Sequence, residues 1–361
     1  MSIKIGIVFN QGIGDALLLM PLIKKIRQQY PVTLHAIFQS EYCQPGLIEH
    51  FELFDEYIVL QNSIKQTLNF TFKRIREFDL LILNHTSASF IWLCLAPIIA
   101  RKTVTNRAHK LLRLIPLVTY IQPRAHTHEI LNNLGLVFTN IEGSELSLQK
   151  LLLPTPSPLP LSIKIEEKLP SSFFTVQISA GNNIVKYKNW PVENWIHLIR
   201  LIRKAYPQIM FILLGEPRES GLAKEIGRQN IEGVVSMVGQ TNINEAIAII
   251  ERSELYIGLD SGLMHLAAMA GKPTFTIWGP TSPKVYGYEQ FNAQRHRDLC
   301  TYEECHPCLS WPTSNQSRVT HPGRCPDRRC ITKISPLQTF EAFCIFWKDY
   351  QKYTLNGQDG H

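Results

Sequence analysis

One segment, residues 257–281, restricts the fold of this chain more than any other. It reads IGLDSGLMHLAAMAGKPTFTIWGPT and joins a buried strand, a polar turn, a small-residue helix, a second strand and another turn. Asp260, Ser261 and Gly262 open the helix, whose first N–H groups lack partners within the helix and carry the positive end of its dipole. Such a terminus attracts phosphate. We therefore predict a binding site for a phosphorylated ligand at this turn.

The predicted helix has features that suit both packing and binding. Its small and apolar residues lie on one face: Leu263, Leu266, Ala267 and Ala270. Gly271 suits the position just beyond the helix end. His265 falls one turn into the helix, roughly on the side of Asp260 and Ser261, so a nucleotide sugar could meet all three. The alternative is an ordinary strand–helix–strand unit with a well-capped helix.

The length of 361 residues exceeds one usual compact core and favours two domains. Strands and helices alternate in both halves, which is typical of parallel sheets with crossover helices. The predicted strands are IKIGIVF, TLHAIF, EYIVL, DLLILN and KTVT, then FFTVQIS, MFILLG, VVSMVG, ELYIGL and TFTIWG. Five prolines between residues 154 and 170 interrupt this pattern. We predict Rossmann-like domains at 1–160 and 171–335 and a C-terminal helix at 336–361.

Positive charge concentrates at residues 99–128, which hold six Lys or Arg and no Asp or Glu, in a chain of net charge +7. Five of these cations are candidate acceptor-binding residues: Arg101, Lys102, Arg107, Lys110 and Arg113. An anionic glycolipid or an anionic membrane face suits them. Nucleic acid is disfavoured, because no zinc-finger, RRM or KH pattern accompanies them. A merely solvated surface is the alternative.

The sequence favours a cytoplasmic location. The chain starts directly with an alternating strand and lacks the basic and apolar regions of a secretory signal. Its longest apolar run, at 89–100, is shorter than the roughly 20 residues that span a bilayer, and Pro97 interrupts it. We expect at most peripheral contact with the inner membrane surface.

Asp15 is the candidate catalytic residue of the first half. It follows the first predicted strand in a glycine-rich turn and precedes a helix, so its carboxylate should point towards ligands at the strand ends. A carboxylate there can take a proton from an attacking hydroxyl. The alternative role is a helix N-cap. A dinucleotide fingerprint is disfavoured because position 17 is Leu rather than Gly, and no Walker A loop is present.

The segment GIGDALLLMPLIKKIRQQYP at residues 12–31, together with residues 257–281, resembles the ADP-heptose:lipopolysaccharide heptosyltransferases, known as glycosyltransferase family 9. The resemblance implies the α/β fold called GT-B, with two Rossmann-like domains facing across a cleft. It places the acceptor in the N-terminal domain and the nucleotide sugar in the C-terminal domain. It also implies that Asp15 is the general base.

Further donor-binding residues come from the same resemblance. Lys188 matches the lysine that contacts the donor phosphates in the family's K-x-W-P segment, and Glu219 matches an acidic residue used on the nucleotide ribose or base. From the sequence alone, the alternatives are a solvated lysine, which is the commoner case in an exposed loop, and a glutamate that favours a helix start. The predicted donor site comprises Ser179, Lys188, Glu219, Asp260, Ser261, Gly262, His265 and Thr281.

The resemblance implies inverting transfer of heptose from ADP-heptose to a hydroxyl of a lipopolysaccharide core sugar. No D-x-D motif follows a strand, which favours catalysis without a divalent metal or any other cofactor. A protein acceptor, as in relatives that glycosylate autotransporters, is one alternative. A nucleotide-sugar epimerase of the same fold and a non-catalytic sugar-nucleotide or glycolipid binding protein are the others.

Cysteines cluster near the end of the chain, with five of the eight between residues 300 and 330. Two pairs, Cys305-x-x-Cys308 and Cys325-x4-Cys330, have nearly the spacing of a four-thiolate site for zinc or iron. Substitute ligands are Cys300, His296, His306 and His321. Because some relatives of the family carry iron, the metal would be structural, in a Cys-rich loop at 300–330. Reduced thiols are the alternative.

Overall fold

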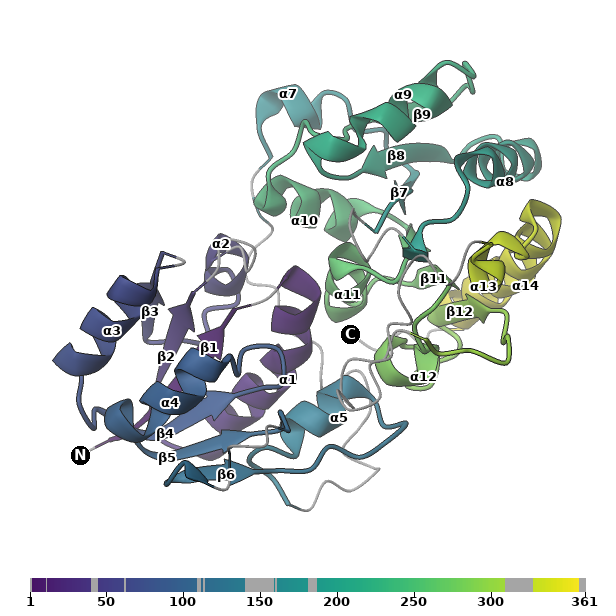
Figure 1. Cartoon of the computed structure of the whole chain (residues 1–361). Helices are drawn as coiled ribbons and strands as arrows, with labels where there is room; N and C mark the ends of the chain where they lie inside the picture. Colours follow the sequence, from purple (N-terminus) through teal and green to yellow (C-terminus); the bar gives the residue numbers. More distant parts are fainter. Residues whose placement is uncertain are drawn as a thin grey trace. The chain divides into compact units, whose positions relative to one another are not determined.

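The structure is a computed structural model that describes residues 2–10, 12–39, 45–61, 63–108, 112, 114–139, 159, 161–180, 187–308 and 327–356. The chain divides into two compact units (Figure 1). Among the described residues, 2–139 belong to the first unit and 159–356 to the second.

The first unit is built on a parallel six-stranded sheet with the order β3-β2-β1-β4-β5-β6. Its strands are β1 (Ile3–Phe9), β2 (Val32–Phe38), β3 (Glu56–Val59), β4 (Phe78–Leu83), β5 (Ala100–Thr105) and β6 (Val118–Tyr120). Its helices are α1 (Ile13–Gln29), α2 (Pro45–Glu49), α3 (Ile64–Lys73), α4 (Phe90–Ile99) and α5 (Glu129–Leu134). In register, Ile5 of β1 pairs with Leu34 of β2 and with Leu80 of β4.

The second unit repeats the plan with the sheet order β12-β11-β10-β7-β8-β9. Its strands are β7 (Phe173–Gln177), β8 (Met210–Leu214), β9 (Val234–Ser236), β10 (Leu255–Leu259), β11 (Thr274–Trp278) and β12 (His296–Cys300). Its helices are α7 (Ile163–Glu166), α8 (Val192–Ala205), α9 (Ser220–Gly227), α10 (Ile243–Arg252), α11 (Gly262–Met269), α12 (Pro283–Tyr286), α13 (Arg329–Thr332) and α14 (Pro336–Leu355), with a 3-10 turn, η5, at Pro217–Glu219.

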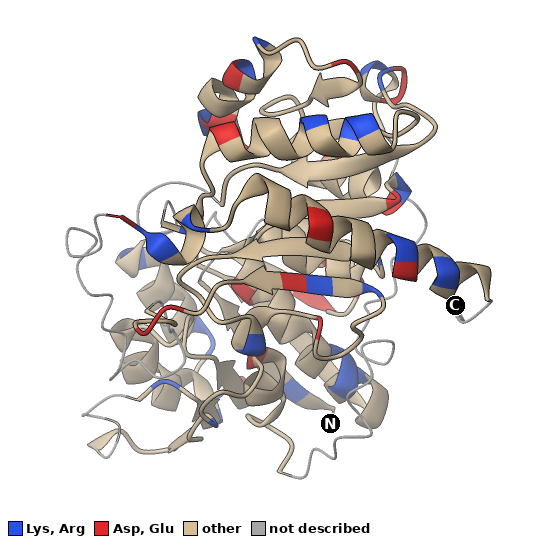
Figure 2. Ribbon diagram, turned by 90° about the vertical axis from the view of Figure 1, so that its right-hand side faces the viewer, with Lys and Arg blue, Asp and Glu red and all other residues tan. Residues whose placement is uncertain are grey.

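Each sheet has its own apolar core. In the first unit, Phe78, Leu81 and Trp92 are fully buried between the strands and α4. In the second, α14 packs beside α8, and its Phe343 and Trp347 meet the ring of Phe174 on β7. In the second sheet, β7 to β11 contain no Lys, Arg, Asp or Glu, as expected of parallel strands covered by helices on both faces, whereas β12 contains Arg297 and Asp298 (Figure 2).

All ten predicted strands are present, which confirms the expectation of two parallel α/β sheets. Two further strands, β6 and β12, were not predicted. β12 has the sequence HRDLC, whose charged residues hide the apolar pattern that marks the other strands. Among the described helices, none combines the length and the apolar character that spanning a membrane demands.

Each sheet also has one point where the strand order reverses its direction along the chain. In the first unit this point lies between β1 and β4, and in the second between β7 and β10. Ligands of open α/β sheets bind outside the carboxyl ends of the strands at such points. The residues that follow these four strands are therefore the first place to look for a site in each unit.

Candidate functional site

The turn after β10 leads into α11 as the sequence predicts. Ser261 is the N-cap, and its Oγ accepts a hydrogen bond of 3.4 Å from the N–H of Met264. Gly262 is the first residue of the helix. Beyond the other end, Gly271 has a φ of 72°, the left-handed conformation predicted for this position. The free N–H groups of the first turn thus lie directly after a strand at the reversal point of the sheet.

Asp260, the residue before this cap, is the centre of a buried polar cluster. Its Oδ2 lies 2.7 Å from Nζ of Lys188 and accepts a hydrogen bond of 2.6 Å from Oγ1 of Thr281. Its Oδ1 lies 3.9 Å from Nε2 of His265. The Lys188 side chain is only 12% exposed, which excludes a lysine that is merely solvated. Four of the predicted donor-binding residues therefore meet at one carboxylate.

The charges in this cluster have clear causes. Burial favours the neutral acid, yet the adjacent Lys188 ammonium and the hydrogen bond from Thr281 hold the pKa of Asp260 below its usual value. Burial lowers the pKa of His265 to about 4, so its imidazole is neutral at physiological pH. Nδ1 of that ring lies 3.0 Å from the hydroxyl of Tyr288. The cluster therefore holds one ion pair and a neutral ring.

Ser179 and Glu219 form a second group at the ends of β7 and β8. The Ser179 hydroxyl hydrogen-bonds the Glu219 carboxylate, which also accepts a bond of 3.1 Å from the N–H of Glu216. Glu219 is 4% exposed. Burial raises the pKa of its carboxyl, and these hydrogen bonds oppose that rise only in part. A carboxylate has two oxygen atoms, so a buried one can accept hydrogen bonds from two neighbouring hydroxyls of a sugar.

Two neighbours of Ser261 were missed by the sequence analysis. Oε1 of Gln177 accepts hydrogen bonds from the Tyr256 hydroxyl, at 2.6 Å, and from the Ser261 hydroxyl. Tyr256 can lie along its own strand because Gly258 has no side chain: a Cβ there would come within 2.5 Å of the Tyr256 hydroxyl oxygen. The one available signal was a glycine two residues after a tyrosine inside a buried strand.

In the first unit, Asp15 lies at the reversal point between β1 and β4. Gly12 is the N-cap of α1, so Asp15 is the third residue of the helix and not its cap. The carboxylate lines a small hollow together with residues that follow the two strands: Asn10, Asn84, Thr86 and Ser87. The helix dipole favours a negative charge in this first turn. The lining of the hollow thus combines one acidic residue with amide, hydroxyl and apolar residues.

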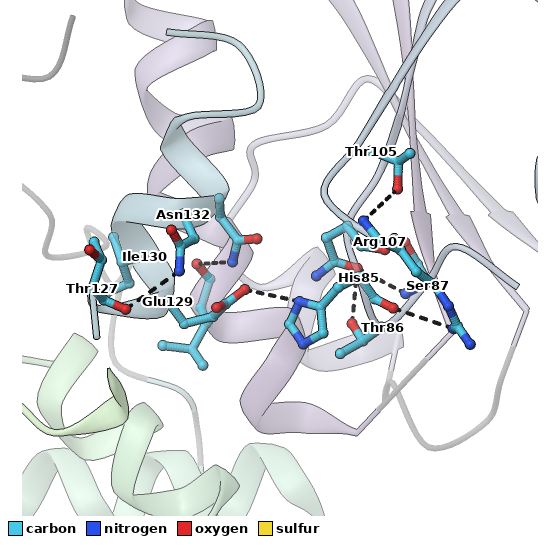
Figure 3. A network of polar contacts seen from close by, with 12 residues as sticks. His85, Thr86, Ser87, Thr105, Arg107, Thr127, Glu129, Ile130 and Asn132 are labelled. Atoms are coloured by element: carbon cyan, nitrogen blue, oxygen red, sulfur yellow. Dashed lines mark hydrogen bonds and ion pairs between the residues drawn. The ribbon is translucent and has the colours of Figure 1, made fainter. Parts of the chain in front are cut away.

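A buried ion pair lies beside this hollow. His85 directly follows Asn84, and its Nδ1 lies 3.0 Å from Oε1 of Glu129 at the start of α5 (Figure 3). The two side chains are 9% and 1% exposed. Burial alone would favour the neutral ring, but Glu129 and, to a smaller extent, Asp15 raise the pKa of His85 above its ordinary value. The sequence does not predict this pair, because no local pattern indicates that these two distant residues are in contact.

The basic candidates are partly described. Arg101 and Lys102 are exposed on β5, where Nε of Arg101 lies 3.3 Å from Asp79. Arg107 is half-buried and donates a hydrogen bond of 3.4 Å to the carbonyl of His85, which brings it to the edge of the Asp15 hollow (Figure 3). Lys110 and Arg113 lie outside the described residues.

Three of the four cysteines of the predicted metal site are described. Cys305 is exposed, Cys308 is half-buried and Cys330 is buried in α13. In the described part of the chain, Cys305, Cys308 and Cys330 do not form a group whose three sulfur atoms all lie within 4.8 Å of one another, and Cys325 and His321 lie outside that part. Cys300 ends β12, so the segment is not a loop throughout.

The two described histidines offered as substitute ligands have other partners. His296 bonds Thr274 at 2.9 Å at the opposite end of β12 from Cys300. Nε2 of His306 lies 2.9 Å from the carbonyl of Thr281 and 3.5 Å from Sγ of Cys300, so two of the substitute ligands are neighbours. The metal site stays a prediction, because Cys325 and His321 lie outside the described residues.

A different group in the first unit has the spacing of metal ligands: His35, Glu56 and Glu77. Arg74 lies among them, with its guanidinium 2.8 Å from Glu56 and 2.9 Å from Glu77. The guanidinium pairs with both carboxylates, Lys4 lies 3.5 Å from Glu77 as well, and these positive charges would repel a metal cation. We therefore interpret this group as an ion-pair network.

Comparison with known proteins identifies the family. The model of glycosyltransferase family 9 (heptosyltransferase) matches residues 74–318, more than half of the chain. The chain belongs to glycosyltransferase family 9. This match starts after Asp15, so it includes the predicted donor residues and not the proposed base.

Individual family 9 proteins agree with this result. Lipooligosaccharide heptosyltransferase 2 of Haemophilus influenzae is 35% identical over 27% of this chain and 29% of its own length. Lipooligosaccharide heptosyltransferase 2 of Haemophilus ducreyi is 24% identical over 78% of this chain and 84% of its own. The solved ADP-heptose lps heptosyltransferase II of E. coli is 17% identical, covers 95% of this chain and 98% of its own, and has a TM-score of 0.66. This likeness confirms the GT-B fold class.

Proposed function

We propose that this family 9 protein transfers heptose from ADP-heptose, with inversion at the anomeric carbon, to a hydroxyl of a lipopolysaccharide core sugar. The observation that carries the proposal is the cluster of Lys188, Asp260 and Thr281 at the N-terminus of α11. The names of the similar proteins support the sugar and the acceptor, since they are heptosyltransferases of lipopolysaccharide or lipooligosaccharide.

The donor diphosphate would lie at the N-terminus of α11. Ser261 and Gly262 offer backbone N–H groups there, and the Lys188 ammonium supplies a full positive charge. Charge that develops on the leaving diphosphate would be stabilised by these fixed groups. We therefore propose catalysis that needs no divalent metal, for which an unchanged transfer rate in excess chelator is the expected result.

The nucleoside would lie towards Ser179 and Glu219. The Glu219 carboxylate is held by the Ser179 hydroxyl and by the N–H of Glu216, so its orientation is fixed before any ligand binds. One carboxylate can accept hydrogen bonds from both hydroxyls of a ribose. We propose that this group binds the ribose of the donor nucleotide.

Asp15 would act as the general base. Its place in the first turn of α1 favours the ionised form, which is the form that accepts a proton. It would take the proton of the acceptor hydroxyl while that oxygen attacks the anomeric carbon from the face opposite the diphosphate. The exposed Arg101 and Lys102, with Arg107, would attract an anionic glycolipid acceptor. A cytoplasmic location and contact with the inner membrane stay predictions.

Asp15→Asn tests the base assignment. The substitution keeps size and hydrogen bonding but removes the basic oxygen, so we expect kcat for transfer to fall about a hundredfold or more. The Kd for ADP-heptose, measured by calorimetry, should change less than about twofold, because the donor binds other residues. Glu49→Gln, the same change at an exposed position of the same unit, is the matched control. Transfer by Asp15→Asn at the wild-type rate would show that another group is the base.

A protein acceptor is the alternative within the same reaction. Conversion of the donor to another nucleotide sugar without any acceptor would instead identify an epimerase. Donor binding without transfer by the wild type, left unchanged in Asp15→Asn, would point to a non-catalytic binding protein.

A further inference from the structure

Helix α3 presents its apolar residues to solvent rather than to the core of the first unit. Ile64, Leu68 and Phe72 are 60%, 37% and 57% exposed, and Ile75, just beyond the helix end, is 61% exposed. Because residues four apart share a face of a helix, the first three form one continuous stripe. Figure 1 shows α3 at the edge of the first unit, beside the edge strand β3.

The inward face of α3 carries small polar residues instead. Thr67 and Thr71 are fully buried, and Phe70 is the buried apolar residue of the described helix. Oγ1 of Thr67 accepts a hydrogen bond of 3.1 Å from Gln39, and Oγ1 of Thr71 donates one of 2.9 Å to the carbonyl of Thr67. The packing of the unit therefore uses the threonine side of α3 and does not explain the exposed stripe.

The charged residues next in sequence to the stripe residues are cationic. Residues 57–76 contain no Asp or Glu, while Lys65 and Lys73 are exposed, each next in sequence to a stripe residue. Arg74 pairs with Glu56 and Glu77, and Lys4 lies 3.5 Å from Glu77, so these two positive and two negative charges cancel. Arg76, beside Ile75, is exposed as well. An apolar stripe bordered by cations is the pattern of a helix that lies in the interface of an anionic lipid bilayer.

We propose that this surface, made of Ile64, Leu68, Phe72 and Ile75 with Lys65 and Lys73, docks the protein on an anionic membrane. The four apolar side chains would enter the boundary between headgroups and acyl chains, and the ammonium groups would meet the headgroup phosphates. The inference goes beyond the proposed transfer reaction, because it concerns where the protein works and holds for any donor sugar. It assigns the membrane contact to α3 rather than to the basic stretch at residues 99–128.

The first test is vesicle co-sedimentation of the full chain with phosphatidylglycerol–phosphatidylethanolamine vesicles. Leu68→Ser/Phe72→Ser should lower the partition coefficient about tenfold or more, because two large apolar side chains no longer enter the bilayer. Leu337→Ser/Ile345→Ser is the matched control: both residues are exposed, at 58% and 65%, on α14 of the second unit. Binding by this control should equal that of the wild type.

A second variant examines the charges without touching the stripe. Lys65→Gln/Lys73→Gln should weaken binding to the anionic vesicles about tenfold and bind phosphatidylcholine vesicles as the wild type does. Far-UV circular dichroism and the urea midpoint of all variants should match the wild type, because the altered side chains are exposed. This pair of variants keeps the proposal testable even where one of them folds poorly.

Three results would overturn the proposal: no binding of the wild type to anionic vesicles, equal binding by both α3 variants, or a wild-type dimer that Leu68→Ser/Phe72→Ser makes monomeric. The last would mean that a second copy of the chain covers the stripe. Transfer to a water-soluble acceptor should be normal in every α3 variant. If the proposed function is wrong, the wild type does not carry out that transfer. If only the docking proposal is wrong, the wild type still carries it out.

Discussion

Lys188 and Asp260 form a buried ion pair, with 2.7 Å between Nζ and Oδ2, although 72 residues separate them in the chain. The pair joins the segment after β7 to the turn after β10, the two strands at the reversal point of the second sheet. Without a ligand, each charge is neutralised by the other. A donor diphosphate would share the ammonium, so the pair orders the lysine before the donor arrives.

The first prediction concerns this pair. Lys188→Met and Asp260→Asn each remove one charge of the pair and leave the other charge buried without its partner. Each variant should therefore lower the free energy of unfolding by about 3 kcal/mol. The double variant should lose clearly less than the sum, because no unpaired charge remains. Urea unfolding at neutral pH measures all three. Additive losses would show that the two residues do not stabilise one another.

The second prediction concerns Glu219, whose pKa burial raises. A raised carboxyl pKa means that ionisation destabilises the folded state, with the cost present above the folded pKa and absent below the unfolded one. Glu219→Gln should therefore raise the urea midpoint at pH 8 and change it little at pH 4. The same variant should bind ADP-heptose about tenfold more weakly. Glu232→Gln, at an exposed position, serves as the control; a midpoint shift that does not depend on pH would contradict the prediction.

The third prediction concerns His85 and Glu129. Burial opposes the charge on His85, but Glu129 raises its pKa in the folded state above the ordinary value of 6.5. The stabilisation is therefore fully present below that value and is lost as the pH rises through the folded pKa. Glu129→Gln should be less stable than the wild type at pH 6, by about 1 kcal/mol or more, with a smaller difference at pH 9. Thermal unfolding across this range checks it, and a constant difference would speak against a protonated His85.

The fourth prediction concerns Gly258. An alanine Cβ would come within 2.5 Å of the Tyr256 hydroxyl oxygen, so the ring must move away from Gln177 and Ser261. We expect Gly258→Ala to lower the free energy of unfolding by about 1–3 kcal/mol and to weaken donor binding. Tyr256→Phe, which keeps the ring and removes the hydroxyl, separates the two effects. Wild-type stability of Gly258→Ala would show that the strand relaxes easily.

The sequence predicts the fold of this protein well because parallel strands are continuous apolar runs, and LYIGL and TFTIW stand out between helices. It predicts Asp260 and Ser261 for a similar reason, since a polar turn between a buried strand and a helix is a local pattern. β12 was missed because HRDLC lacks that apolar pattern.

Partners distant in the chain are harder to predict. Glu129 contacts His85, and Gln177 contacts Tyr256, because the fold brings distant parts of the chain together. The sequence around these residues does not indicate which distant residue each will contact. The cysteine spacing suggested a metal site, yet spacing alone does not fix where a strand and a helix place their sulfur atoms. Cys300 and Cys330 lie in regular elements that were not expected there.

The measurement that tests the account most directly is calorimetric titration of the purified protein with ADP-heptose, compared with other ADP-sugars and with UDP- and GDP-sugars. The account predicts selective binding of ADP-heptose, with an affinity that Lys188→Met lowers about tenfold or more. Binding of a UDP- or GDP-sugar alone would keep the family and the fold but contradict the proposed donor.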